Sequence, residues 1–260
     1  MLHHVRLRPP SHDYPADEWN VIEKAFHPEF LAQLETILAL GNGYLGMRGC
    51  AEEGGPNVEN STLINGFYET WPIVYGEEAY GFAKTGQTIC NVTDSKIIKL
   101  FVDDEPFWLP DANLLSYDRR LNMKSGTLDR EILWETPAGK QVSIRSRRLV
   151  SFENRHVAAI SYCVTLLNSK AFIVLSSEMA TDKPSGGING DDPRLAKAFS
   201  GRVLNPRANY CERRRIVLCH ATEKSRLTVT CATDHGLETS CPHTEKVVHT
   251  DDFGQVVFTI

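Results

Sequence analysis

The strongest constraint on the fold is a pattern of short alternating strands that fills the chain after residue 85. Apolar and polar residues alternate over 98–102, 128–135 and 158–166. Turn residues separate such runs at intervals of about 8–12 residues, the spacing typical of sandwiches and barrels. Pro137-Ala138-Gly139 predicts a hairpin between two runs. No amphipathic stretch of helical length lies between the strands, which argues against a parallel α/β sheet. The pattern therefore predicts an all-β fold.

Further strands are predicted at 171–177, 216–218, 227–231 and 256–258. One long polar segment, 181–194, interrupts the pattern and is too long for a hairpin turn. Loops of more than about 12 residues tend to be functional or disordered. We therefore take three charged residues of this segment as candidates for contact with a substrate or partner: Asp191, Asp192 and Arg194.

The N-terminal part gives a weaker signal. Residues 1–30 are predicted to form an irregular lead-in, because the stretch begins with many Pro, His and Asp residues. Within it, the spacing of Trp19, Ile22 and Phe26 predicts one face of a short helix. The apolar spacing continues to Leu34, where periodicity alone leaves helix and strand open.

Composition and charge argue against several classes of function. A formal net charge of −5 is the wrong sign for a nucleic-acid partner. No apolar run reaches the ~18 residues of a membrane-spanning helix, and the N-terminus lacks the apolar segment of a signal peptide. We therefore expect a cytoplasmic protein with no membrane partner. The seven cysteines include no CxxC pair, and the nine histidines lack the spacing of metal ligands. No metal or cofactor is predicted.

A glycine-rich run, 41–49, contains the Gly-x-Gly-x-x-Gly spacing of dinucleotide sites. Such a site needs a helix that begins at the glycines, and the residues at 52–56 cannot continue one. We therefore interpret the run as close packing of strands. A larger side chain at Gly43 or Gly46 is expected to cause strain and overpacking. The residues of this structural motif are Gly41, Asn42, Gly43, Tyr44, Gly46, Arg48 and Gly49.

A second stretch, 67–82, combines aromatic residues with carboxylates. This combination suits sugars, because rings stack on the apolar faces of a sugar and carboxylates accept bonds from its hydroxyl groups. The simpler interpretation is the edge of a core with solvated acids. The candidates for a substrate- or partner-facing role are Tyr68, Glu69, Trp71, Tyr75, Glu77 and Glu78.

Four motifs in order, at 40–49, 65–71, 75–81 and 191–194, resemble the N-terminal domain of glycoside hydrolase family 65. That family includes maltose, trehalose and kojibiose phosphorylases. The resemblance covers nearly the whole chain. It implies an antiparallel super-sandwich of two large sheets, similar to galactose mutarotase, with few short helices. It also implies a strand from about Glu35 and one domain over 31–260.

The resemblance implies a role in carbohydrate metabolism. Family members mostly cleave α-linked glucosides by glycosyl transfer to inorganic phosphate, which is then the co-substrate, and a few hydrolyse instead. They place the general acid in a downstream (α/α)6 barrel, so no catalytic residue is expected in this chain. The implied role is a non-catalytic domain that shapes the active-site entrance or a subunit contact. The expected partners are that barrel, α-linked glucosides and a second copy of the chain. The last residues form an apolar strand without a turn, as expected of a domain cut from a longer enzyme.

A free-standing carbohydrate-binding or mutarotase-like β-sandwich is the alternative. Mutarotase-like enzymes need a histidine and a glutamate as acid and base on the sugar ring. His156, His220 and His235 are available, but none lies in a motif that matches.

Overall fold

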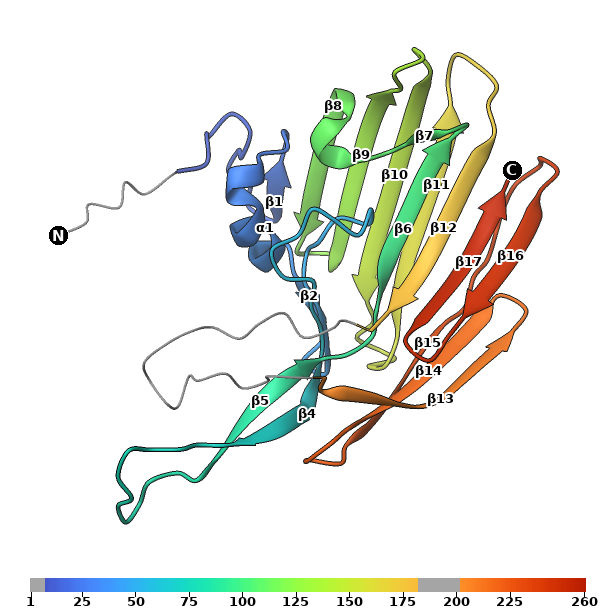
Figure 1. Cartoon of the computed structure of the whole chain (residues 1–260). Coiled ribbons are helices and arrows are strands. Elements are labelled where there is room, and N and C mark those ends of the chain that lie inside the picture. Colours follow the sequence, from blue (N-terminus) through green and yellow to red (C-terminus); the bar gives the residue numbers. More distant parts are fainter. Residues whose placement is uncertain (1–7, 182–201) are drawn as a thin grey trace. The chain divides into compact units, whose positions relative to one another are not determined.

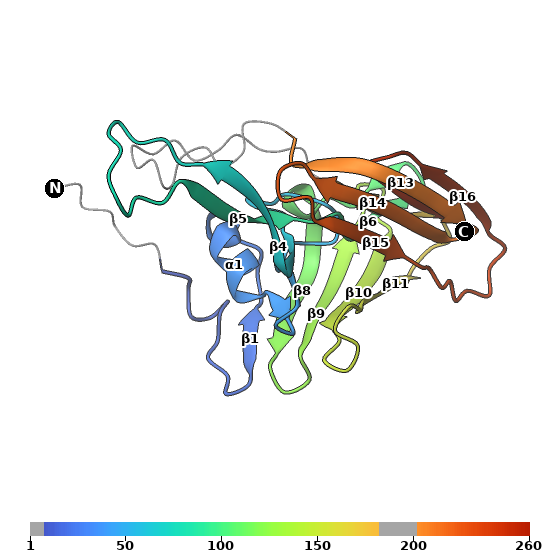
Figure 2. The same cartoon turned by 90° about the horizontal axis from the view of Figure 1, so that it is seen from below.

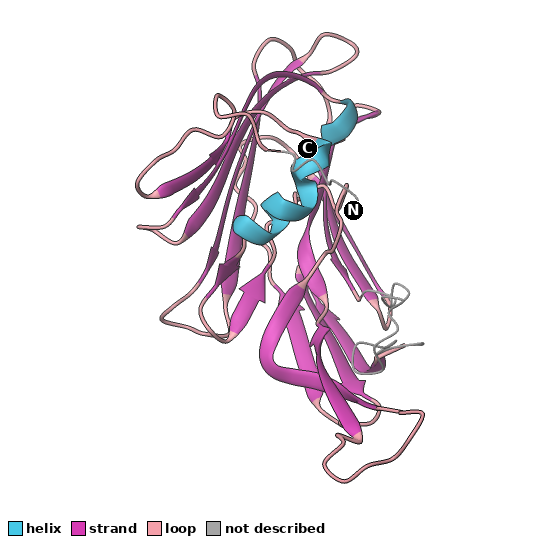
Figure 3. Cartoon of the chain, turned by 90° about the vertical axis from the view of Figure 1, so that its left-hand side faces the viewer, coloured by secondary structure: helices cyan, strands magenta, loops and turns pink. Residues whose placement is uncertain are grey.

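A computed structural model describes residues 8–181 and 202–260. Within them the chain is mostly strand, with one short α-helix, α1 (Leu31–Ile37), and two 3-10 helices, η1 (Pro28–Phe30) and η2 (Leu109–Asp111). Figure 3 shows how few the helical turns are. The predicted all-β class is confirmed, and the two-sheet super-sandwich stays a prediction.

The chain divides into two compact units. Unit 1 comprises Met1–Asn60 and Lys99–Val174, and unit 2 comprises Ser61–Ile98 and Leu175–Ile260. The chain passes from unit 1 to unit 2 after Asn60, returns to unit 1 within β6 (Asp94–Val102), and enters unit 2 again within β12 (Ile173–Ala180). Each unit is described by itself below.

Unit 1 is built on a five-stranded antiparallel sheet with the strand order β1-β8-β9-β10-β11 (Figure 1). Its strands are β1 (Asn20–Glu23), β8 (Asn113–Asn122), β9 (Thr127–Glu135), β10 (Gln141–Val150) and β11 (Ala158–Leu166). The hairpin predicted around Pro137-Ala138-Gly139 is confirmed, since β9 and β10 pair from Gln141↔Glu135 onward. The unit also holds β2 (Leu40–Gly41), β3 (Leu45–Met47) and β7 (Glu105–Pro106), which pairs with the end of β6.

Two expectations for the N-terminal part of unit 1 are wrong. The spacing of Trp19, Ile22 and Phe26 belongs to no helix, because β1 occupies 20–23 as an edge strand beside β8. The strand expected from Glu35 is the second half of α1, and strand structure begins only at Leu40. The helix is favoured because it buries Leu34 and Glu35 on one side. The lead-in over 1–30 therefore contains β1 and η1, and the domain boundary at residue 31 stays a prediction.

Unit 2 contains a long hairpin and a small sheet. The hairpin is made of β4 (Thr62–Pro72) and β5 (Thr85–Asn91). Strands β13 (Leu204–Glu212), β14 (Arg215–Thr222) and β15 (Thr228–Thr233) form the three-stranded antiparallel sheet seen in Figure 2. Strands β16 (Thr244–His249) and β17 (Phe253–Thr259) form another hairpin. The strands predicted at 216–218, 227–231 and 256–258 all lie in these elements.

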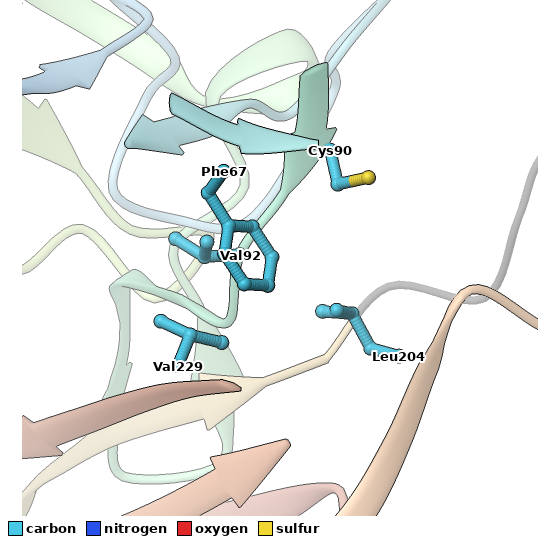
Figure 4. Packing of buried hydrophobic residues seen from close by; sticks show 5 residues of the cluster. All are labelled: Phe67, Cys90, Val92, Leu204 and Val229. Atoms are coloured by element: carbon cyan, nitrogen blue, oxygen red, sulfur yellow. The ribbon is translucent and has the colours of Figure 1, made fainter. Parts of the chain in front are cut away.

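The core of unit 2 is apolar. In Figure 4, Phe67 and Val92 point toward Leu204 and Val229, and all four side chains are buried. A second buried cluster joins β12, β14 and β17 through Met179, Ile216, Leu218, Val256 and Phe258. Burial of such side chains contributes about 1.5–3 kcal/mol each relative to exposure in water. Unit 2 therefore has the core that its alternating strands predicted.

Candidate functional site

Asn42 organises the turn of the glycine-rich segment. Its side-chain Oδ1 accepts hydrogen bonds from the backbone N–H groups of Tyr44 and Leu45, at 3.0 and 2.8 Å. Its Nδ2 donates to the carbonyl oxygens of Ser151 and Arg155, at 2.6 and 3.1 Å. One side chain thus shapes the turn between β2 and β3 and ties it to the loop after β10. This is the local hydrogen bonding for which Asn is favoured in turns.

Glycine is required at residues 43 and 49 for different structural reasons. Gly43 has a φ of +84°, which disfavours any residue with a side chain. At Gly49 a Cβ atom would lie 2.7 Å from the Cβ of Leu38, so the space there is already filled. The expectation of overpacking is wrong at both Gly43 and Gly46, because a Cβ at either position would have no neighbour within 4 Å among the described residues. The strain expected at Gly46 is also wrong, because its φ lies outside the left-handed region.

Beyond the glycines, the segment is anchored by three buried arginines that share one face of the unit 1 sheet. Arg119 on β8 lies opposite Arg130 on β9 in the strand register. On β10, Ser146 is the register partner of Arg130. Arg148 lies two residues further along β10 and therefore on the same face of the sheet. Like charges placed this way repel unless carboxylates lie between them. Glu52 and Glu53, which follow the glycine run, supply those carboxylates. We call these five residues the arginine cluster.

Contacts in the arginine cluster are short, and the contact between Arg130 and Glu53 is bidentate. Arg130 donates to both carboxylate oxygens of Glu53, at 2.8 and 2.6 Å. It also lies 2.8 Å from Glu52, which accepts a 2.7 Å bond from Arg148. Arg148 donates further to the carbonyl oxygens of Arg48 and Cys50, and Arg119 donates to that of Gly49. The cluster therefore holds the irregular backbone of 48–53 against the sheet.

Electrostatics inside the cluster favour the charged forms. Burial raises the pKa of the Glu52 carboxyl, but Arg130 and Arg148 outweigh this effect and leave its pKa well below the ordinary value. Burial lowers the pKa of Arg130, and the two glutamates more than reverse that shift. All of these charges are buried and paired, so the cluster offers no group to a substrate. Sequence reasoning missed it, although three arginines at inward positions of alternating strands were a readable signal.

Near the end of β4 that leads into the hairpin tip, the candidate Glu69 is fully engaged in holding a turn. Its carboxylate accepts hydrogen bonds from the backbone N–H groups of Glu223, Lys224 and Ser225, at 2.8–2.9 Å, and from that of Thr70. Burial raises the pKa of this carboxyl, but the four N–H donors outweigh burial and lower it. Glu69 therefore fixes the β14–β15 turn.

The other candidates on the hairpin divide between its paired strands and its tip. Trp71 on β4 is buried, and its indole N–H donates to the Thr88 hydroxyl at 2.9 Å. Tyr68 and Tyr75 are half-buried. The hairpin tip, residues 73–84, exposes both candidate acids, Glu77 and Glu78, together with Val74 and Tyr80. Phe82, which is 47% exposed, stacks on Tyr75 with ring centroids 4.8 Å apart. In Figure 1 the tip projects away from the three-stranded sheet of its own unit.

The remaining candidates do not form an acid–base site among the described residues. Asp191, Asp192 and Arg194 lie outside the described ranges. His220 is fully buried, 3.0 Å from Asp252, and therefore out of reach of a sugar in solution. His156 is exposed and packs edge-on against Tyr44. The Nε2 of His235 lies 2.9 Å from the hydroxyl of Ser177.

A hollow of about 620 Å³ lies in unit 2 beside the Arg213-Arg214-Arg215 turn. Its arginines are largely neutralised, since Arg214 pairs with Glu245 and Arg215 with Asp234. A further hollow, of about 490 Å³, lies in unit 1 around Trp108. Residues 8–181 and 202–260 contain no group of His, Cys, Asp and Glu side chains able to hold a metal ion. Nor does any helix there have the length and apolarity to cross a membrane.

The fold has a counterpart among solved structures. A putative kojibiose phosphorylase from the human microbiome matches with a TM-score of 0.76 over 98% of this chain and 31% of that chain, at 19% identity. The sequence matches the model of the glycosyl hydrolase family 65 N-terminal domain over residues 21–260. The chain therefore belongs to this family, as the resemblance of its motifs implied.

Several similar proteins carry phosphorylase names, and others are named uncharacterized glycosyl hydrolases. An α,α-trehalose phosphorylase of Thermoanaerobacter brockii is 42% identical over 86% of this chain and 29% of its own length. A kojibiose phosphorylase of Halothermothrix orenii is 30% identical over 65% of this chain and 20% of its own length. The chain thus spans less than a third of the length of these relatives.

Proposed function

We propose that this chain is the non-catalytic N-terminal domain of an inverting phosphorylase that acts on α-linked glucosides in carbohydrate metabolism. Its β4–β5 hairpin would line the active-site entrance of a downstream (α/α)6 barrel or form a contact with a second copy. The observation that carries the proposal is the exposed aromatic tip of this hairpin in a family 65 N-terminal domain. The cytoplasm is the compartment that fits such an enzyme.

The hairpin is built to present its tip. Trp71 and Glu69 lie on β4 near the tip and fix the paired strands through the contacts described above, so the strands that carry the tip are anchored. Exposed apolar patches on soluble domains commonly mark interaction surfaces. The tip combines such a patch with two carboxylates, Glu77 and Glu78, which could accept bonds from sugar hydroxyls or from basic groups of a partner.

The proposed reaction assigns no chemical step to this chain. An oxygen of inorganic phosphate attacks the anomeric carbon, the glycosidic bond breaks, and the leaving oxygen takes a proton from a general acid in the barrel. Glucose 1-phosphate forms with inversion. Phosphate carries its own negative charge, so no second carboxylate is needed to activate it, unlike the water of an inverting hydrolase.

A chimaera tests the proposal. This chain replaces the matching N-terminal part of the Thermoanaerobacter brockii trehalose phosphorylase, and release of glucose 1-phosphate from trehalose, kojibiose and maltose is measured with phosphate present. We expect the chimaera to be active on trehalose and the 260-residue chain alone to be inactive on all three sugars. The double variant Tyr80→Ser/Phe82→Ser should lower chimaera activity or assembly at least tenfold, since aromatic anchors dominate interface energetics. Phe152→Ser, an exposed phenylalanine in unit 1, serves as the matched control.

Two results would count against the proposal. Turnover by the isolated chain, abolished by a substitution within it, would mean that it carries its own catalytic groups. Equal activity of the tip variant and the Phe152→Ser control would mean that the hairpin tip contributes neither to the active-site entrance nor to a subunit contact. Mutarotation of glucose by the isolated chain would instead favour the free-standing mutarotase-like alternative, although the burial of His220 argues against it.

A further inference from the structure

The hollow around Trp108 in unit 1 has no part in the proposed function. It lies where the β6–β7 turn, η2 and the β9–β10 hairpin turn meet, and all its lining residues belong to unit 1. Its volume of about 490 Å³ falls in the range of small-molecule sites, which is roughly 300–1,000 Å³. The lining includes Pro106, Ala112 and Pro137 as apolar surface.

Trp108 presents an aromatic surface to this hollow and is held in place. The side chain is 39% exposed, a large fraction for a tryptophan, while its neighbours Phe107 and Leu109 are buried. Gly55 lies directly against the ring, because a Cβ atom there would be 2.7 Å from Cη2 of Trp108. The absence of a side chain at residue 55 therefore sets the position of the indole.

Polar groups around the hollow are mostly acceptors. Glu105 accepts a 3.0 Å hydrogen bond from the Ala138 N–H through Oε1, while its Oε2 is buried without a donor among the described residues. Glu135 accepts from the side-chain amides of Asn113 and Gln141, at 3.3 and 3.5 Å. Asp104 and Asp111 also line the hollow, and no lining residue is a lysine or arginine.

We infer that this hollow is a second, non-catalytic binding site for a neutral saccharide of one or two units. A sugar offers an apolar C–H face for the Trp108 ring and hydroxyl donors for the surrounding carboxylates. A cation is the competing ligand, since it would stack on the ring and meet the carboxylates. The saccharide is favoured over a cation because part of the lining is apolar. In addition, the Glu135 carboxylate already accepts hydrogen bonds from two side-chain amides, so it has less need of a cation. The inference goes beyond the proposed function and does not depend on it.

The 260-residue chain is titrated by calorimetry with glucose, maltose and trehalose, and separately with tetramethylammonium chloride as the cationic probe. We expect saturable binding of at least one sugar in the millimolar range. Trp108→Ala should weaken that binding by about tenfold or more, because the aromatic surface is removed. Trp19→Ala is the matched control: it removes another exposed tryptophan of unit 1, which lies outside the lining.

Gly55→Ala is a second test of the same site, for the case in which Trp108→Ala disturbs folding. The added Cβ displaces the end of the indole, so sugar affinity should fall while the melting temperature stays close to that of the original chain. The inference is overturned if no sugar binds, if Trp108→Ala and Gly55→Ala bind as the original chain does, or if only the ammonium probe binds. Activity of the chimaera is a separate readout, so failure here leaves the proposed function standing.

Discussion

The two units hold an irregular segment against a sheet in opposite ways. In unit 1 the arginine cluster pairs full charges to fix the backbone of 48–53, and every member is buried. In unit 2 a single carboxylate, Glu69, fixes the β14–β15 turn by accepting bonds from neutral N–H groups. Both sites are buried, so they differ in whether the carboxylates face full charges or neutral N–H groups. A buried pair gives little net stability, yet removing one partner leaves an unpaired charge.

Removal of Arg130 should therefore have the largest effect. Arg130→Met leaves the buried Glu53 carboxylate without its bidentate partner. We therefore expect a loss of about 3–5 kcal/mol in the free energy of unfolding. Denaturant unfolding measures the loss. Hydrogen exchange at Cys50 and its neighbours should show that 48–53 detaches from the sheet first.

The matched control is Arg147→Met on the neighbouring strand, where the arginine is exposed and pairs with Asp129 at the surface. A surface pair of this kind contributes little to stability, because water and salt screen it. If Arg130→Met cost no more than the control, the arginine cluster would not be the anchor of the glycine-rich segment.

Glu69 should give a smaller effect that depends on pH. Glu69→Gln replaces one acceptor oxygen by an amide that faces N–H donors, so we expect a loss of about 1–3 kcal/mol near neutral pH. The folded-state pKa of Glu69 lies below its unfolded value of about 4.3. The ionised carboxylate therefore stabilises the fold above that value, and its contribution is lost as the pH falls through the folded pKa.

Urea unfolding of both proteins over a pH series measures this dependence. The stability difference between the original chain and Glu69→Gln should be constant near neutral pH and shrink below pH of about 4. Glu223→Gln removes an exposed charge from the same turn and should show a much smaller difference. A difference that did not change with pH would mean that ionisation of Glu69 is not what holds the turn.

The same contrast explains how much the sequence could predict. The β9–β10 hairpin was predictable because alternation and a Pro-Ala-Gly turn are local signals. The inward placement of the arginines was readable from the alternation, but their pairing with the glutamates was not, because Glu53 and Arg130 are 77 residues apart and only the folded sheet brings them together. The helical nature of α1 was missed because the resemblance suggested a strand where burial of Leu34 and Glu35 favours a helix. Of the candidate acids, Glu69 could not be read as a turn anchor, since its donors lie more than 150 residues away.

The glycine-rich segment offers the smallest and most local test. Space is open around both Gly43 and Gly46, so of these two glycines only Gly43, with its positive φ, should resist substitution. Gly43→Ala should cost about 1–2 kcal/mol, because an L-residue is forced into the left-handed region at φ +84°. Gly46→Ala should change stability by no more than about 0.5 kcal/mol, since its Cβ would meet open space among the described residues. Thermal melts of the two variants side by side decide the matter. Equal losses at both positions would mean that the segment is restrained by something other than its own backbone, such as a partner seated on it.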